Sequence, residues 1–211
     1  MKKILKKIKK KLWDYLNLEN KMKALDSRIV DESNLHKMLL GKILIGQMID
    51  RGPVDDIRKS EFKVFSQWGD DGIIQYIINN IDIPSKTFVE FGVEDYREAN
   101  TRFLLMNNNW SGLVMDSSEK YVERIKNSGI YPGYDLTAKH AFVDKDNING
   151  LIASRFKGEI GLLHIDIDGN DYWVWKAINV VSPVVVIMEY NSAFGIERPI
   201  TIPYDKNFER T

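Results

Sequence analysis

The sequence has no cysteine among its 211 residues. Disulfide bonds, thiolate-bound zinc and a cysteine nucleophile are therefore excluded from its chemistry. Proteins of oxidising compartments commonly use disulfides, whereas proteins of reducing compartments do without them. The absence of cysteine predicts a cytoplasmic protein.

Long apolar runs are missing too. No uninterrupted apolar segment reaches the 18 or so residues that a membrane-spanning helix needs. The first residues also contain no apolar run of signal-peptide length. We therefore expect neither export nor a membrane-spanning segment.

The chain has no net charge, because 30 basic and 30 acidic residues cancel. Seven lysines and no acidic residue lie in the first eleven positions, so the other 200 residues carry a net charge of −7. A protein that binds nucleic acid through its core usually presents a basic surface there. The charge balance therefore predicts no nucleic-acid partner.

These lysines belong to an amphipathic helical pattern over residues 1–16. At about 100° per residue, the apolar side chains share roughly a third of the circumference, with most lysines opposite. They are Ile4, Leu5, Ile8, Leu12, Tyr15 and Leu16. One interpretation is a helix that lies on the anionic inner face of a membrane as a peripheral contact. The alternative is a stripe that packs on the protein's own surface or on a partner.

The pattern stays helical from residue 17 to residue 50 and is broken at Arg51-Gly52-Pro53. The charged segment that follows, up to Lys59, has the composition of a linker. We therefore expect an N-terminal helical extension with its linker at 1–58 and a Rossmann-like domain at 59–211.

Strand and helix patterns alternate after the linker. The predicted strands are 87–91, 111–115, 140–143, 160–167 and 184–190, and the predicted helices are 72–80, 99–106, 119–126, 148–156 and 172–178. The last strand is apolar at almost every position, which is typical of parallel sheets that helices cover on both faces. The expected fold class is α/β, with a Rossmann-like doubly wound sheet that is mostly parallel.

Acidic residues stand at the ends of most of these strands. They are Glu90, Asp116, Asp166 with Asp168, and Glu189. Ligands of doubly wound sheets bind beyond the carboxyl ends of the strands, near the point where the strand order reverses. The sequence therefore predicts a ligand site lined by carboxylates.

Gly92 follows the first strand, and its lack of a side chain suggests a close approach of backbone and ligand. The glycine pattern of dinucleotide sites is incomplete, because Glu94 stands at a position where glycine is usual. An acid there would repel the pyrophosphate of NAD or FAD. A cofactor without phosphates, such as S-adenosylmethionine, is favoured, because carboxylates suit its ammonium and sulfonium groups.

Asp116 ends the second strand, 21 residues after Asp95. Its carboxylate suits a bidentate contact with the two hydroxyl groups of a ribose. The alternative is a capping role for the helix that begins near Ser117, Ser118 and Glu119.

Asp166 and Asp168 have the same parity in their strand, and Glu189 ends the neighbouring strand. Three carboxylates at one sheet edge predict a site for a hard divalent cation such as Mg²⁺. Asp166 or Asp168 is alternatively a catalytic general base, with a pKa raised by its acidic neighbours. In the simplest alternative, Asp168 or Asp171 caps the next helix and Asn170 serves the turn.

Three other residues of this segment are expected to have structural roles. His164 lies deeper in the strand than Asp166, which predicts a hydrogen-bonded core histidine. Trp173 and Trp175 are two residues apart on a predicted helix, and core packing is expected for both.

Together these segments resemble an FkbM-like family of class I S-adenosylmethionine-dependent methyltransferases, many of which are associated with surface polysaccharide or natural-product pathways. The resemblance covers roughly residues 65–208. It rests on Ser66-Gln67-Trp68-Gly69-Asp70-Asp71-Gly72, Val89-Glu90-Phe91-Gly92 with Asn100-Thr101-Arg102, Trp110-Ser111-Gly112-Leu113, and Ile165-Asp166-Ile167-Asp168-Gly169-Asn170-Asp171-Tyr172. It implies cofactor contacts from Glu90, Gly92 and Asp116, a position for Asp166 near the reacting centre, and a pocket lined by Gln67 and Asn100.

The expected function is methyl transfer from S-adenosylmethionine to a hydroxyl of a sugar or polysaccharide precursor. One alternative is a non-catalytic module that binds a nucleoside, and another is a nicotinamide-dependent oxidoreductase, which the missing glycines disfavour. Family members usually continue into two further strands after the position of Tyr190. We therefore expect residues 184–190 to form an exposed sheet edge through which the protein self-associates.

Overall fold

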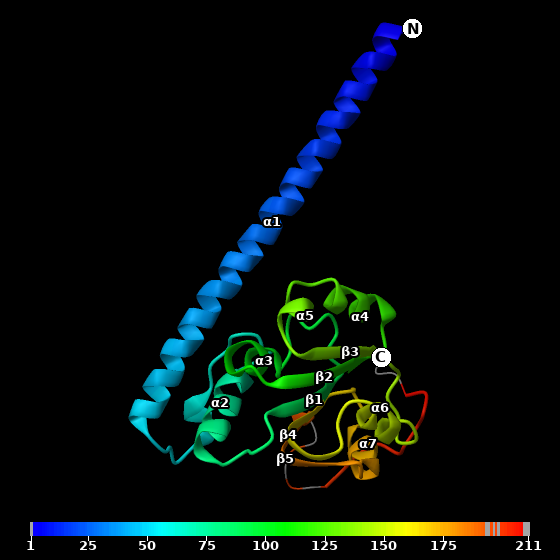
Figure 1. The fold of residues 1–211 in the computed structure, drawn as a ribbon. Coiled ribbons are helices and arrows are strands. Elements are labelled where there is room, and N and C mark those ends of the chain that lie inside the picture. The colour runs from blue at the N-terminus through cyan, green and yellow to red at the C-terminus, as the bar shows by residue number, and fades with distance from the viewer. Residues whose placement is uncertain (1, 193–194, 196, 198, 209–211) are drawn as a thin grey trace. The chain divides into compact units, whose positions relative to one another are not determined.

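The computed structural model describes residues 2–192, 195, 197 and 199–208 (Figure 1). The chain divides into two compact units, Met1–Ile43 and Leu44–Thr211. The last two turns of the N-terminal helix and the segment expected to be a linker therefore belong to the second unit. None of the described helices is both long enough and apolar enough to cross a membrane.

One continuous helix, α1 (Lys2–Arg51), contains the whole of the first unit. Its 50 residues correspond to about 75 Å at 1.5 Å per residue. It has no internal proline, and it ends where Gly52 takes a left-handed conformation with φ +77° immediately before Pro53. The helical pattern predicted for residues 1–50 is confirmed for residues 2–50, and Met1 lies outside the described residues.

The apolar stripe expected over residues 1–16 falls mainly on side chains outside the described ones. Tyr15 and Leu16, which are described, are 66% and 50% exposed. Within the first unit, therefore, these two side chains are not buried.

The second unit is built on a sheet of five parallel strands: β1 (Thr87–Phe91), β2 (Ser111–Asp116), β3 (Leu136–His140), β4 (Gly158–Ile165) and β5 (Val181–Met188). Their order is β3-β2-β1-β4-β5, which reverses between β1 and β4 (Figure 1). The expected fold, an α/β Rossmann-like doubly wound sheet with an N-terminal helical extension, is confirmed.

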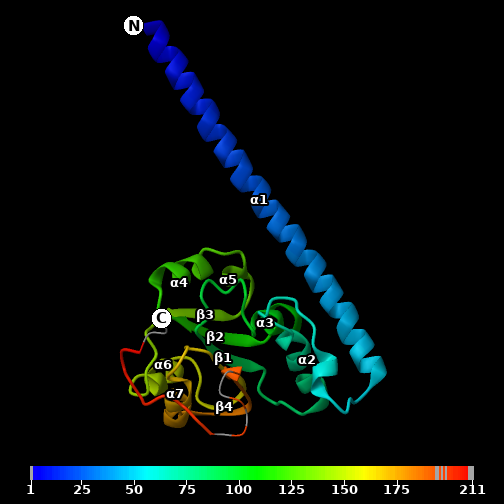
Figure 2. The same cartoon turned by 180° about the vertical axis from the view of Figure 1, so that it is seen from behind.

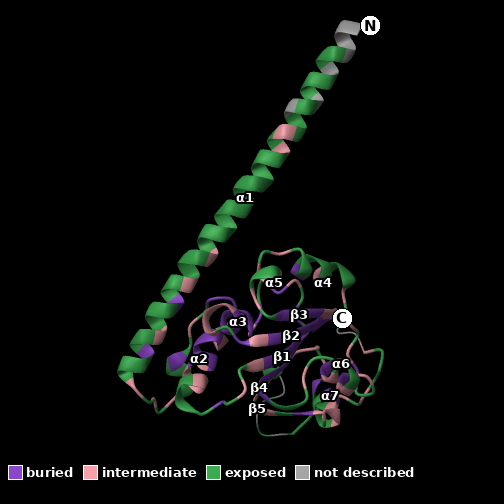
Figure 3. Ribbon diagram, in the orientation of Figure 1, coloured by how far each residue is buried: buried purple, intermediate pink, exposed green. Residues whose placement is uncertain are grey.

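Helices cover both faces of the sheet (Figures 1 and 2). One face packs against α2 (Asp70–Asn80), α3 (Arg102–Asn108), α4 (Glu119–Lys126) and the single turn α5 (Ile130–Gly133), and the other packs against α6 (Ile148–Ala153) and α7 (Asp171–Ala177). The side chains of β1 alternate between the two apolar clusters, with Phe88 on the first face and Val89 and Phe91 on the second. The central strands are accordingly buried, whereas most of α1 is exposed (Figure 3).

Several predicted boundaries need correction. The third strand was expected at 140–143 but is Leu136–His140, because residues 136–140 pair with β2 and the chain leaves the sheet after them. The strands β4 and β5 begin two to three residues earlier than expected. The short helices α5 and η1 (Ile57–Ser60) were not predicted, since a single turn has too few positions for a helical period.

The edge strand β5 also departs from its expected burial. Val184 and Val186 are 39% and 36% exposed, although helices were expected to cover both faces. The apolar cluster under α6 and α7 includes Val181 and Met188, at the two ends of the strand, and leaves the middle of this face exposed. As expected, β5 forms one edge of the sheet among the described strands.

Candidate functional site

A cavity of about 890 Å³ lies at the carboxyl ends of β1, β2, β4 and β5. All the site residues predicted from the sequence line it. They are Gln67, Glu90, Gly92, Asn100, Asp116, Asp166, Asp168 and Glu189. The cavity spans the point between β1 and β4 where the strand order reverses, which is the usual ligand position in this class of sheet.

Gly92 lies at this reversal point, directly after β1. It takes a left-handed conformation with φ +83°, and an added Cβ would lie only 1.6 Å from the carbonyl oxygen of Asp166. Glycine is therefore required here because the backbones after β1 and β4 approach each other closely. This contact between neighbouring backbone segments is a reason for glycine that the sequence did not indicate. The close approach to a ligand stays a prediction, and Gly92 lines the cavity.

Glu90 is buried at the end of β1 and holds the start of α3. Its Oε1 accepts a hydrogen bond from the backbone N–H of Asn100 at 3.0 Å, and its Oε2 accepts one from the backbone N–H of Thr101 at 3.1 Å. The hydroxyl of Thr101 also donates to Oε2. Both carboxylate oxygens are thus used within the protein, and Glu90 positions Asn100 at the cavity wall.

His164 forms a buried pair with Glu90, with 3.1 Å between its Nδ1 and Oε1 of the carboxylate. Its Nε2 lies 2.7 Å from Nδ2 of Asn100. Burial alone would lower the pKa of His164, but the Glu90 carboxylate raises it above its ordinary value. Burial alone would raise the pKa of Glu90, but His164 together with the hydrogen bonds from Thr101 and Asn100 lowers it below its ordinary value. The predicted role of a hydrogen-bonded core histidine is confirmed.

The Asp116 carboxylate joins two loops at the end of β2. Its Oδ2 accepts a hydrogen bond from the backbone N–H of Glu94 at 2.8 Å, and its Oδ1 accepts one from that of Ser118 at 2.7 Å. The contact with Ser118 forms a turn before α4, and Ser118 is itself the N-cap residue, so Asp116 does not cap this helix as the alternative proposed. Each oxygen receives one of these hydrogen bonds, and a carboxylate has about four lone-pair sites in all, so both oxygens have capacity for a further donor. Burial raises the pKa of Asp116 despite these bonds.

Asp166, Asp168 and Glu189 converge at the ends of β4 and β5. One carboxylate oxygen from each lies within 4.8 Å of those of the other two. Asp166 is half-buried, and the other two are exposed. Burial and the charge of Glu189 raise the pKa of Asp166 to about 6. The cluster that the sequence predicted therefore exists as a geometric unit.

Asp171 shapes the loop that carries these acids. Its Oδ1 accepts a hydrogen bond from the backbone N–H of Ile167 at 2.8 Å, and its Oδ2 accepts one from that of Gly169 at 2.7 Å. Asp168 between them has a left-handed conformation with φ +57°. Asp171 thus holds the loop before α7 and does not cap the helix as one alternative proposed, because the N-cap residue is Asn170. Asp168 lines the cavity.

The segment after β5 returns to the cavity in a way that the sequence did not indicate. The side chain of Asn170 donates to the carbonyl of Asp205 at 2.7 Å, and the indole N–H of Trp173 donates to the carbonyl of Ile202 at 2.8 Å. These bonds bring Phe208 to the cavity wall.

The other tryptophan of α7 departs from its expected burial. Core packing was expected for Trp175, but its side chain is 44% exposed.

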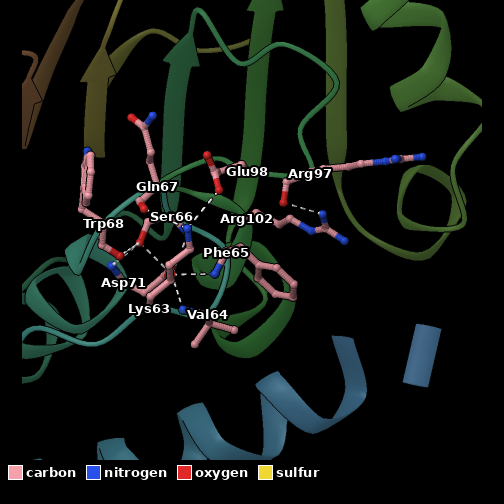
Figure 4. Close-up of polar contacts among 10 residues, drawn as sticks. All are labelled: Lys63, Val64, Phe65, Ser66, Gln67, Trp68, Asp71, Arg97, Glu98 and Arg102. Atoms are coloured by element: carbon pink, nitrogen blue, oxygen red, sulfur yellow. Dashed lines mark hydrogen bonds and ion pairs between the residues drawn. The ribbon is translucent and has the colours of Figure 1, made fainter. Parts of the chain in front are cut away.

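The loop of residues 63–69 reaches the cavity from the opposite side and is fixed by Asp71 (Figure 4). Oδ2 of Asp71 accepts hydrogen bonds from the backbone N–H groups of Val64, Phe65 and Ser66, each at 2.7 Å, and from the Ser66 hydroxyl at 2.9 Å. A single buried oxygen therefore shapes the loop.

Lys63 and Arg102 complete the support of this loop. The Lys63 ammonium donates to the carbonyl of Gln67 at 2.8 Å and pairs with Glu98 at 3.0 Å. Arg102 is buried with its guanidinium 4.2 Å from the ring centre of Phe65, and it donates to the Arg97 carbonyl at 2.9 Å. The side chains of Gln67, Trp68 and Glu98 extend to the same side of the loop (Figure 4).

Further residues that line the cavity were missed in the sequence analysis. The aromatic ones are Trp68, Tyr121, Phe142, Tyr190 and Phe208. They come from the loop before α2, from α4, from the loop after β3 and from the segment after β5, so no sequence spacing relates them.

The cavity is strongly acidic. Its lining contains eight carboxylates, and among the residues that the structure describes no lysine or arginine lines it. The acids beyond those already discussed are Asp70, Glu94 and Glu98. Such a site attracts cations and repels the phosphates of a dinucleotide.

Comparisons of this chain with protein-family models, with curated proteins and with solved structures find no match.

Proposed function

We propose that this protein transfers a methyl group from S-adenosylmethionine to a hydroxyl of a sugar or polysaccharide precursor. The observation that carries the proposal is the acidic cavity at the strand-order reversal, with Asp116 at the end of β2 and Asp166 after β4. A ligand with ammonium and sulfonium groups fits eight carboxylates, whereas a pyrophosphate does not. The resemblance of the sequence motifs to methyltransferases points to the same cofactor.

In this proposal Asp116 binds the ribose hydroxyls. The backbone N–H groups of Glu94 and Ser118 hold its two oxygens in place, so the carboxylate is oriented before the cofactor arrives. When bound, the cofactor supplies a methyl group activated by the positive sulfur. The Glu90–His164 pair keeps Asn100 at the wall and makes no direct contact with the reacting atoms.

Asp166 is the proposed base. With a pKa of about 6, its carboxylate is mainly ionised at neutral pH and accepts a proton more readily than an ordinary aspartate does. It takes the proton of the acceptor hydroxyl while the acceptor oxygen bonds to the methyl carbon, and the sulfur keeps the electrons of the broken bond. The product of the cofactor is S-adenosylhomocysteine.

A divalent cation such as Mg²⁺ suits the oxygen cluster of Asp166, Asp168 and Glu189, because hard cations prefer carboxylate ligands. A cation held there would orient the acceptor hydroxyl and make its proton easier to remove. Transfer that a chelator abolishes and Mg²⁺ restores supports this version. Transfer that is insensitive to chelator leaves Asp166 as the base without a metal.

Isothermal titration calorimetry with S-adenosylhomocysteine tests the cofactor site. We expect wild-type protein to bind it and Asp116→Ala to bind about 1 to 3 kcal/mol more weakly, the scale for hydrogen bonds to a charged acceptor. Asp82→Asn is the matched control, because it removes an exposed acid outside the cavity and should leave affinity unchanged. Equal affinity in Asp116→Ala would remove Asp116 from the site.

A transfer assay with labelled S-adenosylmethionine and a panel of saccharide acceptors tests the chemistry. Asp166→Asn should retain binding of S-adenosylhomocysteine and lose turnover. Binding by the wild type without transfer to any acceptor would instead favour a non-catalytic nucleoside-binding module. Binding of NAD in place of the S-adenosyl ligands would contradict the proposal and favour an oxidoreductase.

A further inference from the structure

The exposed part of α1 carries a heptad pattern that the candidate site does not explain. From residue 15 to residue 43, spacings of three and four alternate through nine positions, and seven of these are apolar. The apolar positions are Tyr15, Leu18, Met22, Leu25, Ile29, Leu39 and Ile43. We call the nine positions the seam. An average spacing of 3.5 residues is the signature of helices that supercoil around one another.

The apolar side chains of the seam are all exposed. Their exposed fractions are 66% for Tyr15, 57% for Leu18, 58% for Met22, 55% for Leu25, 58% for Ile29, 50% for Leu39 and 56% for Ile43. An isolated helix of mixed composition is marginal in water, because most helical stability in proteins comes from packing of the apolar face. The seam therefore needs a partner that follows it over four heptads.

We propose that α1 forms a parallel, in-register coiled coil with a second copy of this chain. A partner has to present apolar side chains with the same 3.5-residue period over the same length. A second copy meets both conditions by identity. Residues 15–43 also contain five basic and four acidic residues, so this part of the helix is nearly neutral and has little attraction for an anionic membrane.

The positions that flank the seam favour the parallel orientation. In a parallel pair, the residue before one core position faces the partner residue five places later in the sequence. Lys21 then faces Asp26 of the second copy, and Leu35 faces Leu40, so charge meets opposite charge and apolar meets apolar. An antiparallel pair that overlaps residues 18–43 would place two basic flanking positions, Lys21 and Lys42, beside each other.

The two polar seam positions fix the register. Glu32 and His36 occupy consecutive core layers, and a surface hollow lined by Leu25, Ile29, Glu32 and His36 marks this part of the seam. In register, the Glu32 layer lies next to the His36 layer of the second copy. A shift by one heptad would place Glu32 against Leu25 or Leu39 and His36 against Ile29 or Ile43, so that four core layers would each pair a polar side chain with an apolar one.

Sedimentation equilibrium of the full chain tests the pairing. We expect a dimer, and we expect the double variant Leu25→Asp, Ile29→Asp to weaken it by about 100-fold or more, because both chains would bury unpaired carboxylates. The matched control is Asn20→Asp, Ser27→Asp, which adds the same charges on the opposite face of the helix. A wild-type monomer would overturn the proposal, and so would a dimer that the seam variant leaves intact.

Single-cysteine variants test orientation and register, and the cysteine-free chain makes them unambiguous. Leu18→Cys places the thiols of a parallel, in-register pair opposite each other, so mild oxidation should give a disulfide-linked dimer. Ser27→Cys, on the outer face, should stay reduced. Absence of cross-linking in Leu18→Cys would overturn the parallel arrangement. If the protein were a monomer that sediments with anionic vesicles, and the seam substitutions abolished this sedimentation, the seam would be a membrane-binding face and the pairing would be overturned.

Discussion

The pKa of the Asp166 carboxyl differs between the folded and the unfolded chain. Burial and Glu189 raise its pKa to about 6 in the folded protein, whereas an unfolded chain releases this proton near pH 3.9. The folded state thus binds the proton more tightly, and its stability from this group falls as the pH rises from about 4 to about 6. Ionised Asp166 therefore destabilises the fold at neutral pH.

The substitution Asp166→Asn should reverse that effect. At pH 8 we expect it to raise the free energy of unfolding by about 1 kcal/mol, less than the full pKa shift would imply, because water screens this half-exposed group. The gain should shrink as the pH is lowered toward 4. Urea unfolding of both proteins at several pH values measures it, and a difference that is independent of pH would contradict the electrostatic explanation.

Asp71 supports the cavity without lining it. Its Oδ2 is the shared acceptor of three backbone N–H groups from the loop that carries Gln67 and Trp68 (Figure 4). Asp71→Ala leaves these donors without their acceptor, so we expect the free energy of unfolding to fall by about 3 kcal/mol. Chemical denaturation measures the loss.

The neighbouring substitution, Asp70→Ala, is the control for Asp71→Ala. It removes an acid from the same turn of α2, but none of the three loop N–H groups donates to this acid. We therefore expect the free energy of unfolding to fall by less than about 1 kcal/mol. Equal losses in the two variants would show that charge at the start of α2 matters and that the acceptor does not.

For individual residues, the sequence predicted which side chains lie together at the cavity. It did not predict which groups of the protein hydrogen-bond to them. Strand parity and the rule for strand ends place Glu90, Asp116, Asp166 and Glu189 at one edge, and one cavity indeed contains them. The engagement of Glu90 by the start of α3 depends on how the loop after β1 folds back. No short-range pattern encodes that contact.

The elements were predictable to the extent that their patterns were long. The boundaries of β1 and α4 match the prediction, because apolar periodicity and flanking breakers mark both ends. β3 was displaced, since Leu136 and Ala138 are its only buried residues and a five-residue strand offers little alternation to read. The exposure of Val184 and Val186 depends on which face α7 reaches, which apolarity alone does not specify.

The first turns of α1 are the element for which we predict membrane contact. Seven lysines in the first eleven residues should attract an anionic surface by about 1 kcal/mol each near the headgroups. Replacing all seven by glutamine should therefore abolish sedimentation with vesicles that contain phosphatidylserine, and salt should weaken it in the wild type. The affinity for S-adenosylhomocysteine should not change.

Two exposed lysines of α4 provide the control for this element. Lys120→Gln, Lys126→Gln removes charge outside the N-terminal segment and should leave vesicle binding unchanged. Vesicle binding that persists after loss of the seven lysines would favour the alternative, in which this segment packs against protein.

For the whole molecule, the sequence indicated the fold class but not how the cavity is closed. The doubly wound sheet follows from alternating strand and helix patterns, and its strand order places the cavity. The segment that ends in Phe208 forms part of the wall only because Asn170 and Trp173 bind its backbone carbonyls. These contacts join residues about thirty positions apart, which no local pattern relates.

The open edge of the sheet leads to the last prediction, which concerns assembly of the whole protein. β5 pairs with β4 on one side and is the outermost described strand, and Val184 and Val186 expose apolar surface beside the unpaired backbone. Such edges recruit further strands. We therefore expect light scattering to show species larger than the α1-paired dimer as the protein concentration rises.

Replacement of both exposed valines by lysine separates this edge from the helix seam. Val184→Lys, Val186→Lys should remove the larger species, because charged edges resist strand addition, while the dimer remains. Leu25→Asp, Ile29→Asp should have the opposite effect and leave edge association in place. Amide exchange provides the second measurement: alternate amides of β5 should exchange fast in dilute protein and slow down on association. Slow exchange of every β5 amide in the dilute protein would mean that another segment already covers this edge.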